Sequence, residues 1–298
     1  MTGSSKVELS RTAFLGTGLM GRPMAGHIAA AGFPLSVWNR HADKARPLET
    51  LGVQVAATPA EAASGAAVVC LCLTDAAAVE AVVFGPDGAA QAMTASSILV
   101  DFSTVSPADT RRMAAALAER TGARWVDAPV SGGVAGAEAA SLIVLCGGTP
   151  ADVDALQPLW RAVGRRATRL GDVGAGQAAK LCNQLIVTLN VLAIAEAVAL
   201  ARANGLDVAA LPAALEGGFA DSAPLRIFGP RMAAEVSDPM LCAVSTMAKD
   251  LASAVRSAQA QGLTLPLAEA GDGLYRLAQE AGLGPEDLTV LAALTGAR

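Results

Sequence analysis

The sequence is poor in the residues that build metal and thiol sites, and positive charge is in the minority. It has two histidines, His27 and His41, and five cysteines with no C-x-x-C pair. This composition argues against a zinc centre or a thiol-redox site. Lysine and arginine number 22 against 27 aspartates and glutamates, which gives a net charge of −5. That balance argues against nucleic acid or an anionic membrane as the main partner, so a few local donors must hold any anionic ligand.

Disulfide and membrane signals are weak as well. An odd number of cysteines, with no disulfide framework and no signal peptide, predicts a reducing, cytoplasmic location. The most apolar run, Leu185 to Ala201, includes Thr188, Asn190 and Glu196. It is too short and too polar for a membrane span and is better interpreted as a helix buried between domains or subunits. We interpret the polar residues Met1 to Ser10 as a loose leader.

The 298 residues suffice for two domains with real cores, and 53% of them are hydrophobic. The first half alternates short apolar runs with helical stretches, which predicts a parallel sheet with helices on both faces. The expected strands are Thr12–Gly16, Leu35–Trp38, Ala67–Leu73, Ile98–Asp101, Trp125–Ala128 and Leu142–Cys146. The expected helices are Met20–Ala31, Asp43–Leu51, Ala76–Phe84 and Pro107–Thr121.

After Gly171 strand signals almost vanish. Helices are expected at Gln177–Asn204, Val208–Glu216, Met247–Gln261 and Leu265–Glu280. The fold class is therefore an α/β Rossmann dinucleotide-binding domain, residues 11–173, followed by an all-α helical domain, residues 174–298. The helix at Gln177 would link the two domains.

A glycine-rich loop follows the first expected strand and opens a helix. It fits G-x-G-x-x-G and comprises Gly16, Thr17, Gly18, Leu19, Met20 and Gly21. Glycines in this context permit a tight turn and close approach to a pyrophosphate, which the amino end of the helix attracts. The alternative is a purely structural glycine turn.

The end of the second strand bears on the choice of cofactor. NAD sites usually place an acidic residue there, about 20 residues after the glycines, to bind the ribose. This chain has Asn39 and Arg40 instead. Asn39 can hydrogen-bond, and Arg40 can pair with a 2′-phosphate and stack on adenine, so we expect NADP(H) to be preferred, with NAD(H) possible. The alternative is a solvated Arg40 and use of NAD.

Two further strand ends carry candidate cofactor-binding residues. Leu73 ends the expected strand Ala67–Leu73 and Thr74 follows it, and we assign both to the cofactor site. Thr104 follows the strand Ile98–Asp101 and so lies at the carboxyl edge of the sheet, where nucleotides bind. A simple helix cap ahead of Pro107 is the alternative for Thr104.

The next strand ends in Ser131, Gly132 and Gly133. A serine hydroxyl and two glycines, whose backbone N–H groups can point at an anion, fit a small carboxylate. An ordinary glycine-rich loop is equally compatible with this segment alone.

The strongest chemical signal is Lys180, on a helix that begins after a glycine cluster. Asn183 and Gln184 lie three and four residues later and share its face. Hydride transfer to a carbonyl builds negative charge on oxygen, so a cationic acid beside that oxygen lowers the barrier. Lys180 is therefore the candidate acid, with Asn183 as substrate orienter. Lys249 lies opposite an apolar stripe on a later helix, and a solvated lysine is an equal alternative there.

Together these motifs resemble the β-hydroxyacid dehydrogenase family over nearly the whole chain. The resemblance implies Lys180 as general acid/base, Ser131, Gly132 and Gly133 as carboxylate holders, and Asn183 as orienter. It also implies that Lys249 reaches the substrate or nicotinamide end. Members are commonly dimers or tetramers, which predicts a homodimer or homotetramer.

Two departures from the family pattern leave the substrate open. Gln184 stands where many members have asparagine, and residues 180–200 look most like the tartronate semialdehyde reductase branch. Residues 237–247 lack that branch's pocket pattern. We expect a reductase of a small aldehyde or keto acid, of 3-hydroxyisobutyrate, tartronate semialdehyde or succinic semialdehyde type. The alternatives are an imine or bulkier-ketone reductase, and a non-catalytic NADP-binding sensor.

Overall fold

The computed structural model describes residues 10–294, and the chain divides into two compact units between Lys180 and Leu181. The expected leader falls, apart from Ser10, outside the described residues. The division lies a few residues after the glycine cluster at 171–176, inside a long helix. Each unit is described by itself.

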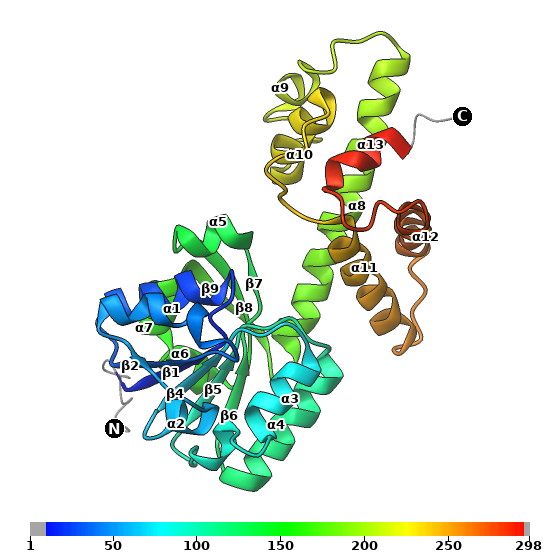
Figure 1. Cartoon of the computed structure of the whole chain (residues 1–298). Coiled ribbons are helices and arrows are strands. Elements are labelled where there is room, and N and C mark those ends of the chain that lie inside the picture. Colours follow the sequence, from blue (N-terminus) through cyan, green and yellow to red (C-terminus); the bar gives the residue numbers. More distant parts are fainter. Residues whose placement is uncertain (1–9, 295–298) are drawn as a thin grey trace. The chain divides into compact units, whose positions relative to one another are not determined.

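Of the described residues, those up to Lys180 form a nine-stranded sheet (Figure 1). Six strands run parallel in the order β3-β2-β1-β4-β5-β6. β8 is antiparallel to β6 and β7, so the sheet is mixed at this edge rather than wholly parallel, and β9 pairs with β8. The strands are β1 (Thr12–Leu15), β2 (Leu35–Trp38), β3 (Gln54–Val55), β4 (Val68–Leu71), β5 (Ile98–Asp101), β6 (Arg124–Asp127), β7 (Val130–Ser131), β8 (Leu142–Gly147) and β9 (Gly164–Gly171).

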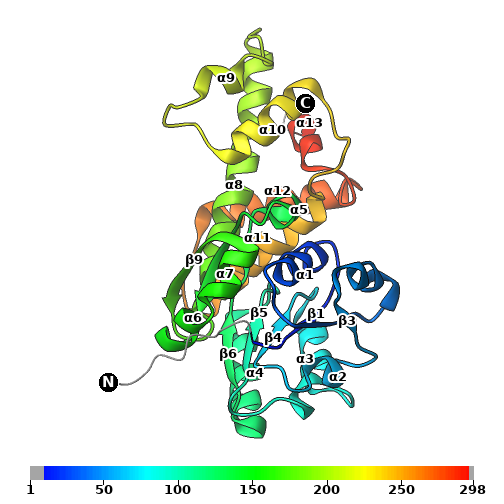
Figure 2. The ribbon, with the colours of Figure 1, turned by 90° about the vertical axis from the view of Figure 1, so that its left-hand side faces the viewer.

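Helices cover both faces of this sheet (Figures 1 and 2). One face packs on α1 (Gly21–Ala30), α5 (Gly133–Glu138), α6 (Pro150–Ala155) and α7 (Gln157–Val163). The other packs on α2 (Pro59–Ala63), α3 (Ala76–Phe84) and α4 (Pro107–Thr121). Strand side chains alternate between the two cores: Phe14 enters the first, and Ala13 and Leu15 the second. The strand order reverses direction between β1 and β4, which places the ligand-binding crevice of such sheets at the end of β1.

One expected helix has a different form. Residues 43–51 do not make an α-helix but two 3₁₀ helices, η1 (Ala42–Lys44) and η2 (Arg46–Leu51). Pro47 lacks the N–H group that an α-helical ladder needs, which explains the break. A further 3₁₀ turn, η3 (Ala89–Gln91), follows α3.

The second unit is helical in its described part. α8 (Ala175–Ala203) begins in the first unit and continues through the second, and the expected helix at residues 208–216 shortens to α9 (Leu211–Leu215). α10 (Ala223–Ala234) was not expected from the sequence, because Pro230 lies inside it. The remaining elements are α11 (Val244–Gln259), α12 (Pro266–Glu280), η4 (Leu288–Val290) and α13 (Leu291–Leu294).

By length and composition, α8 is the one helix of residues 10–294 that could cross a membrane. Core helices of soluble proteins satisfy the same criteria. Its buried positions Val191, Ile194 and Val198 pack with Leu251 of α11 and Tyr275 of α12 in the core of the second unit. We therefore interpret α8 as a core helix.

Candidate active site

The glycine loop after β1 is built as a dinucleotide loop requires. Gly16 has φ +102°, a conformation that favours glycine, and a side chain there would collide with the carbonyl of Cys72. A Cβ at Gly21 would collide with the carbonyl of Gly16. At Gly18, by contrast, a Cβ would meet no described atom within 4 Å. Two glycines therefore fold the loop, and the middle one leaves space where a pyrophosphate can approach.

Asn39, at the end of β2, holds this loop from the side. Its Oδ1 accepts a hydrogen bond from the backbone N–H of Thr17 at 3.0 Å, and its Nδ2 donates to the carbonyl of His41 at 2.9 Å. The Thr17 hydroxyl is buried and has no hydrogen-bond partner among the described residues. A buried hydroxyl without a protein partner is suited to form a hydrogen bond with an oxygen atom of a ligand bound at the loop.

A cavity of about 420 Å³ lies beside the loop and is lined by residues of the first unit alone. Its polar rim carries Arg40, His41 and Lys44 against one acidic residue, Asp87. Trp38, Pro59 and Val82 are among its apolar walls. Apolar walls for a base beside a polar rim suit the adenosine end of a nicotinamide dinucleotide. Of these three basic residues only Arg40 was expected here from the sequence, because neither His41 nor Lys44 belongs to a recognised motif.

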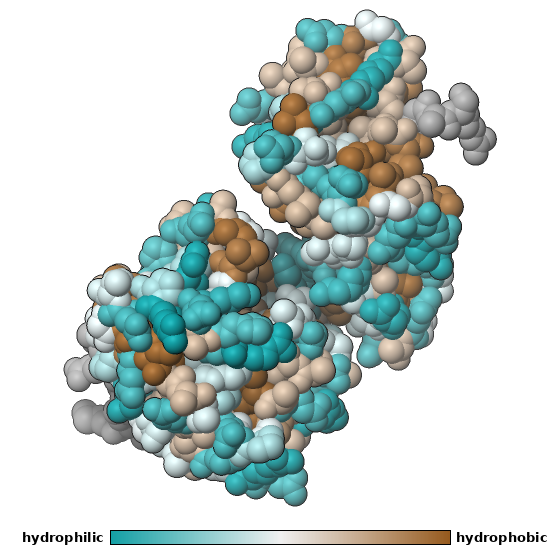
Figure 3. Space-filling model, in the orientation of Figure 1, coloured by the Kyte–Doolittle hydropathy of each residue, from teal (hydrophilic) through white to brown (hydrophobic). Residues whose placement is uncertain are grey.

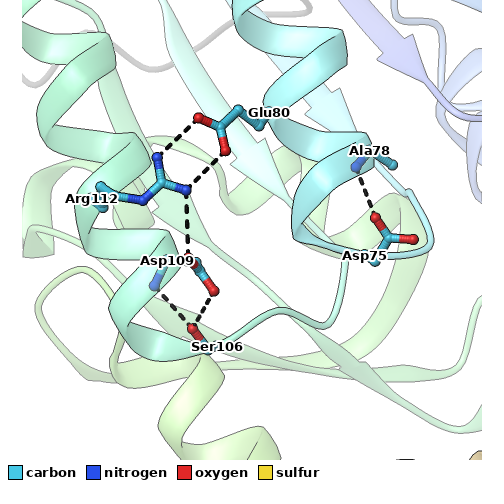
Figure 4. Close-up of polar contacts among 6 residues, drawn as sticks. All are labelled: Asp75, Ala78, Glu80, Ser106, Asp109 and Arg112. Atoms are coloured by element: carbon cyan, nitrogen blue, oxygen red, sulfur yellow. Dashed lines mark hydrogen bonds and ion pairs between the residues drawn. The ribbon is translucent and has the colours of Figure 1, made fainter.

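Helix caps fix the loops that follow β4 and β5 (Figure 4). Thr74, which lines the cavity with Leu73, precedes Asp75, whose carboxylate accepts the N–H of the first turn of α3. Ser106 caps α4 in the same way. Arg112 of α4 forms two hydrogen bonds of 3.0 and 2.9 Å with Glu80 of α3. This pair joins α3 to α4.

Thr104 is half-buried between two residues with buried polar contacts. Before it, Ser103 accepts the N–H of Leu73 through its hydroxyl at 2.9 Å and donates its own N–H to Asp101 at 2.9 Å. Asp101 is fully buried, and its Oδ2 has no hydrogen-bond partner among the described residues. Burial raises the pKa of Asp101 to about 7, against the opposing hydrogen bonds from Ser103.

The predicted carboxylate loop lies at β7 and the start of α5. Ser131 is half-buried in β7, while Gly132 and Gly133 are exposed. Both glycines have positive φ, +136° and +63°, so this backbone favours glycine. Consecutive N–H groups in such a conformation can face an anion.

Lys180 lies against this loop. Its ammonium donates a hydrogen bond of 2.8 Å to the carbonyl of Val130, the residue before Ser131. The residue is only 8% exposed. The structure therefore brings the candidate acid and the candidate carboxylate loop together within one unit.

Asp127 has a role that was not expected from the sequence. It ends β6, is fully buried, and accepts the N–H of Gly174 at 2.7 Å and of Gln177 at 2.8 Å, one on each carboxylate oxygen. Burial raises the pKa of Asp127, and the backbone N–H groups that it accepts limit the rise. A carboxylate thus caps the amino end of α8, where the helix dipole favours negative charge.

Asn183, Gln184 and Lys249 belong to the second unit. Asn183 lies one turn beyond Lys180 on α8, and its amide donates to the Gln184 side-chain oxygen at 2.8 Å. The Gln184 amide in turn donates to Asp250 on α11. Lys249, next in sequence to Asp250, is exposed. Gln184 therefore joins α8 to α11, a contact that local sequence patterns do not predict because its partner lies 66 residues away.

Comparisons with known proteins agree with this organisation. The profile of the NAD-binding domain of 6-phosphogluconate dehydrogenase matches residues 11–171. The profile described as NAD-binding of NADP-dependent 3-hydroxyisobutyrate dehydrogenase matches residues 174–295.

Individual relatives span most of the chain. A 2-hydroxy-3-oxopropionate reductase of Escherichia coli (strain K12) is 37% identical over 255 residues, covering 85% of this chain and 86% of that protein. An NAD-dependent L-serine dehydrogenase of Pseudomonas aeruginosa is 32% identical, covering 96% and 98%. The structure of 3-hydroxyisobutyrate dehydrogenase from Mycobacterium tuberculosis with L-serine superposes with a TM-score of 0.86 at 29% identity, covering 97% and 100%.

One assignment follows from the glycine loop at the switch point of the sheet, from the Asp127-capped helix that carries Lys180, and from these relatives. The chain belongs to the β-hydroxyacid dehydrogenase family and is an NAD(P)-dependent hydroxyacid dehydrogenase.

Proposed function

We propose that this enzyme is an NADPH-preferring reductase that converts a small aldehyde or keto acid to a hydroxy acid, and that the reaction is reversible. The observation that carries the proposal is the 2.8 Å hydrogen bond between the Lys180 ammonium and the carbonyl of Val130. It holds a cation beside a serine-glycine loop suited to a carboxylate. A substrate that bears both a carboxylate and a carbonyl would satisfy both groups.

The residues at the glycine loop fit a nicotinamide dinucleotide. Gly18 leaves room for the pyrophosphate, and the buried Thr17 hydroxyl lacks a protein partner among the described residues. Leu73, Thr74 and Thr104 would hold the rest of the cofactor at the strand ends, with Lys249 at its nicotinamide end. When bound, the reduced nicotinamide supplies the hydride that the carbonyl carbon accepts.

Lys180 supplies the proton. As the carbonyl carbon gains the hydride, charge develops on its oxygen, and the ammonium both stabilises that charge and transfers a proton to it. The product is the hydroxy acid, and the neutral lysine regains a proton from solvent. Ser131, Gly132 and Gly133 hold the carboxylate, Asn183 orients the substrate, and Gln184 supports Asn183 by accepting its amide hydrogen bond.

The preference for NADPH rests on the cationic rim of the cavity. Arg40, His41 and Lys44 line it together. The 2′-phosphate of NADP carries the negative charge that this rim complements, and a guanidinium binds it with two parallel hydrogen bonds. NADH would leave the rim without a partner.

The test is the initial rate of NADPH oxidation, with NADH in parallel, on tartronate, methylmalonate and succinic semialdehydes and on glyoxylate. Rapid turnover of one acid with NADPH supports the proposal. Tight NADPH binding with no turnover of any acid would overturn it. Imines and bulkier ketones would then be tested, and failure on those as well would favour a non-catalytic sensor.

A homo-oligomer is proposed from the second unit. Hydrophobic residues reach the surface in both units (Figure 3), and in the second unit Leu267 and Leu277 of α12 are 70% and 60% exposed. Large exposed leucines on one helix suit contact with a second copy. Sedimentation of the full chain as a dimer or tetramer supports this, and a monomer at micromolar concentration contradicts it.

We propose a cytoplasmic location, with neither nucleic acid nor membrane as a partner.

A further inference from the structure

The Gln177 side chain brackets Thr104 from both sides. Its Oε1 accepts the N–H of Val105 at 3.2 Å, and its Nε2 donates to the carbonyl of Ser103 at 2.8 Å. Gln177 is fully buried, so neither bond is shared with solvent. The Thr104 loop, which is proposed to hold the cofactor, is therefore fixed by a side chain of α8.

The backbone of the same residue is fixed as well. The Gln177 N–H donates to Asp127 at 2.8 Å, and Asp127 is the last residue of β6. The backbone packs closely around this hydrogen bond, because a Cβ at Gly176 would lie 2.8 Å from the Asp127 carboxylate. These contacts hold the first turn of α8 at the end of β6 and fix the rotation of the helix about its own axis.

Lys180 follows Gln177 by three residues, less than one helical turn. Its ammonium contacts Val130, which follows Asp127 by three residues. Two stretches of chain, 127–130 and 177–180, are thus cross-linked at both ends by hydrogen bonds. We call these two stretches and their cross-links the acid frame. Gln177 joins the acid frame to the Thr104 loop.

We propose that Gln177 and Asp127 are positioning residues, which set the place of the Lys180 ammonium relative to the cofactor loop at Thr104. This inference rests on the proposed function of Lys180. A displacement of about 1 Å in such a pair lowers rates by up to about 100-fold without removing any reacting group. The reaction would then depend on two buried residues that touch neither substrate nor cofactor.

The test compares Gln177→Met, which keeps the length but loses both side-chain hydrogen bonds, with Asp152→Asn. Asp152, in the first turn of α6, is a matched control because it is also a buried polar residue of the first unit with two side-chain hydrogen bonds, which it accepts from Thr149 and Arg124. We expect Gln177→Met to lower kcat about 10- to 100-fold. Its dissociation constant for NADPH should stay within about threefold, and the deuterium isotope effect on kcat should rise. Asp152→Asn should lower the melting temperature similarly and leave kcat unchanged. A kcat loss in Gln177→Met no larger than in the control would overturn the proposal.

Gln177→Glu provides a variant of the same shape. The protonated side chain can donate to the Ser103 carbonyl, whereas the ionised one cannot. Its kcat relative to wild type should therefore fall as the pH rises, a dependence that a merely structural role does not predict. A pH-independent ratio would contradict the inference, and this variant decides the matter if Gln177→Met does not fold.

A readout independent of turnover separates this inference from the proposed function. The chain has four lysines, so [13Cε]lysine labelling gives a spectrum simple enough to assign. In Gln177→Met the Lys180 signal should shift, and those of Lys44 and Lys249 should stay in place. An unchanged Lys180 signal would overturn the positioning role even in an active enzyme. A wild-type enzyme that reduces no acid would overturn the proposed function, while the spectrum would still test the acid frame.

Discussion

The two units use buried carboxylates differently. In the first, Asp127 lies at a strand end and caps the helix that carries Lys180. In the second, Asp287 accepts the N–H groups of Leu241 and Cys242 on one oxygen and that of Thr289 on the other, fixing a turn before η4. A buried carboxylate that accepts backbone N–H groups orders a candidate site in one unit and a helix junction in the other. Loss of the Asp127 carboxylate should therefore affect turnover, whereas loss of the Asp287 carboxylate should affect mainly stability.

The largest effect is expected at Lys180. Lys180→Ala removes the proton donor, and kcat should fall about 10²- to 10⁴-fold, the usual contribution of general acid catalysis. The dissociation constant for NADPH, measured by fluorescence, should change less than threefold. Lys180→Arg separates charge from proton transfer, because a guanidinium keeps the charge but does not release its proton near neutral pH. Near-normal turnover in either variant would remove Lys180 from its proposed role.

Two glycines of the same loop should differ sharply. Gly21→Ala places a Cβ against the carbonyl of Gly16, so unfolding should become easier by a few kcal/mol, as in other overpacked sites. Gly18→Ala meets open space and should keep the wild-type melting temperature. It should nevertheless weaken NADPH binding at least tenfold, because the methyl group occupies the place of the pyrophosphate. Equal affinity of Gly18→Ala and wild type would place the cofactor elsewhere.

Asp101 should make the stability of the first unit depend on pH. Its folded pKa of about 7 lies above the usual value of 3.8, so the folded state binds the proton more tightly than the unfolded chain. Stability from this group is therefore present below about pH 4 and is lost as the pH rises through 7. Asp101→Asn cannot ionise and so does not lose stability in this way. The difference in the free energy of unfolding in urea, variant minus wild type, should therefore be roughly 2–4 kcal/mol larger at pH 8 than at pH 5.

Arg40→Ala tests the cofactor preference. Loss of a charged hydrogen bond costs about 1.5–3 kcal/mol, so the KM for NADPH should rise about 10- to 100-fold while that for NADH stays constant. Arg46→Ala is the matched control, since Arg46 is exposed and pairs with Asp43 at 3.2 Å. An unchanged KM for NADPH in Arg40→Ala would leave NAD as the preferred cofactor.

The smallest effect on turnover is expected in the second unit. Gln184→Met leaves the buried Asp250 carboxylate without its amide donor, so stability should fall by about 1–3 kcal/mol. The KM for the acid should rise no more than about threefold, through weaker support of Asn183. Thermal unfolding and steady-state kinetics measure both. A large rise in KM at an unchanged melting temperature would instead place Gln184 on the substrate.

The sequence predicted elements whose signals are local. α4 spans Pro107–Thr121 and β2 spans Leu35–Trp38, as the sequence predicted for both. α10 was missed because Pro230 argues against a helix interior. In the site, Lys180 and the glycine loop were recognisable from spacing. The role of Gln177 was not, because its partners Ser103 and Val105 lie 74 and 72 residues away in the chain.

The continuity of α8 restricts how this chain can change. Its 29 residues share one hydrogen-bonded ladder that begins at the end of β6 and carries Lys180, Asn183 and Gln184 in turn. Each residue advances the helix by about 100°. Replacing side chains along α8 leaves this angular register intact, so new substrate preferences can arise by substitution. A single residue inserted or deleted between Gln177 and Lys180 would turn the acid and everything after it out of phase together.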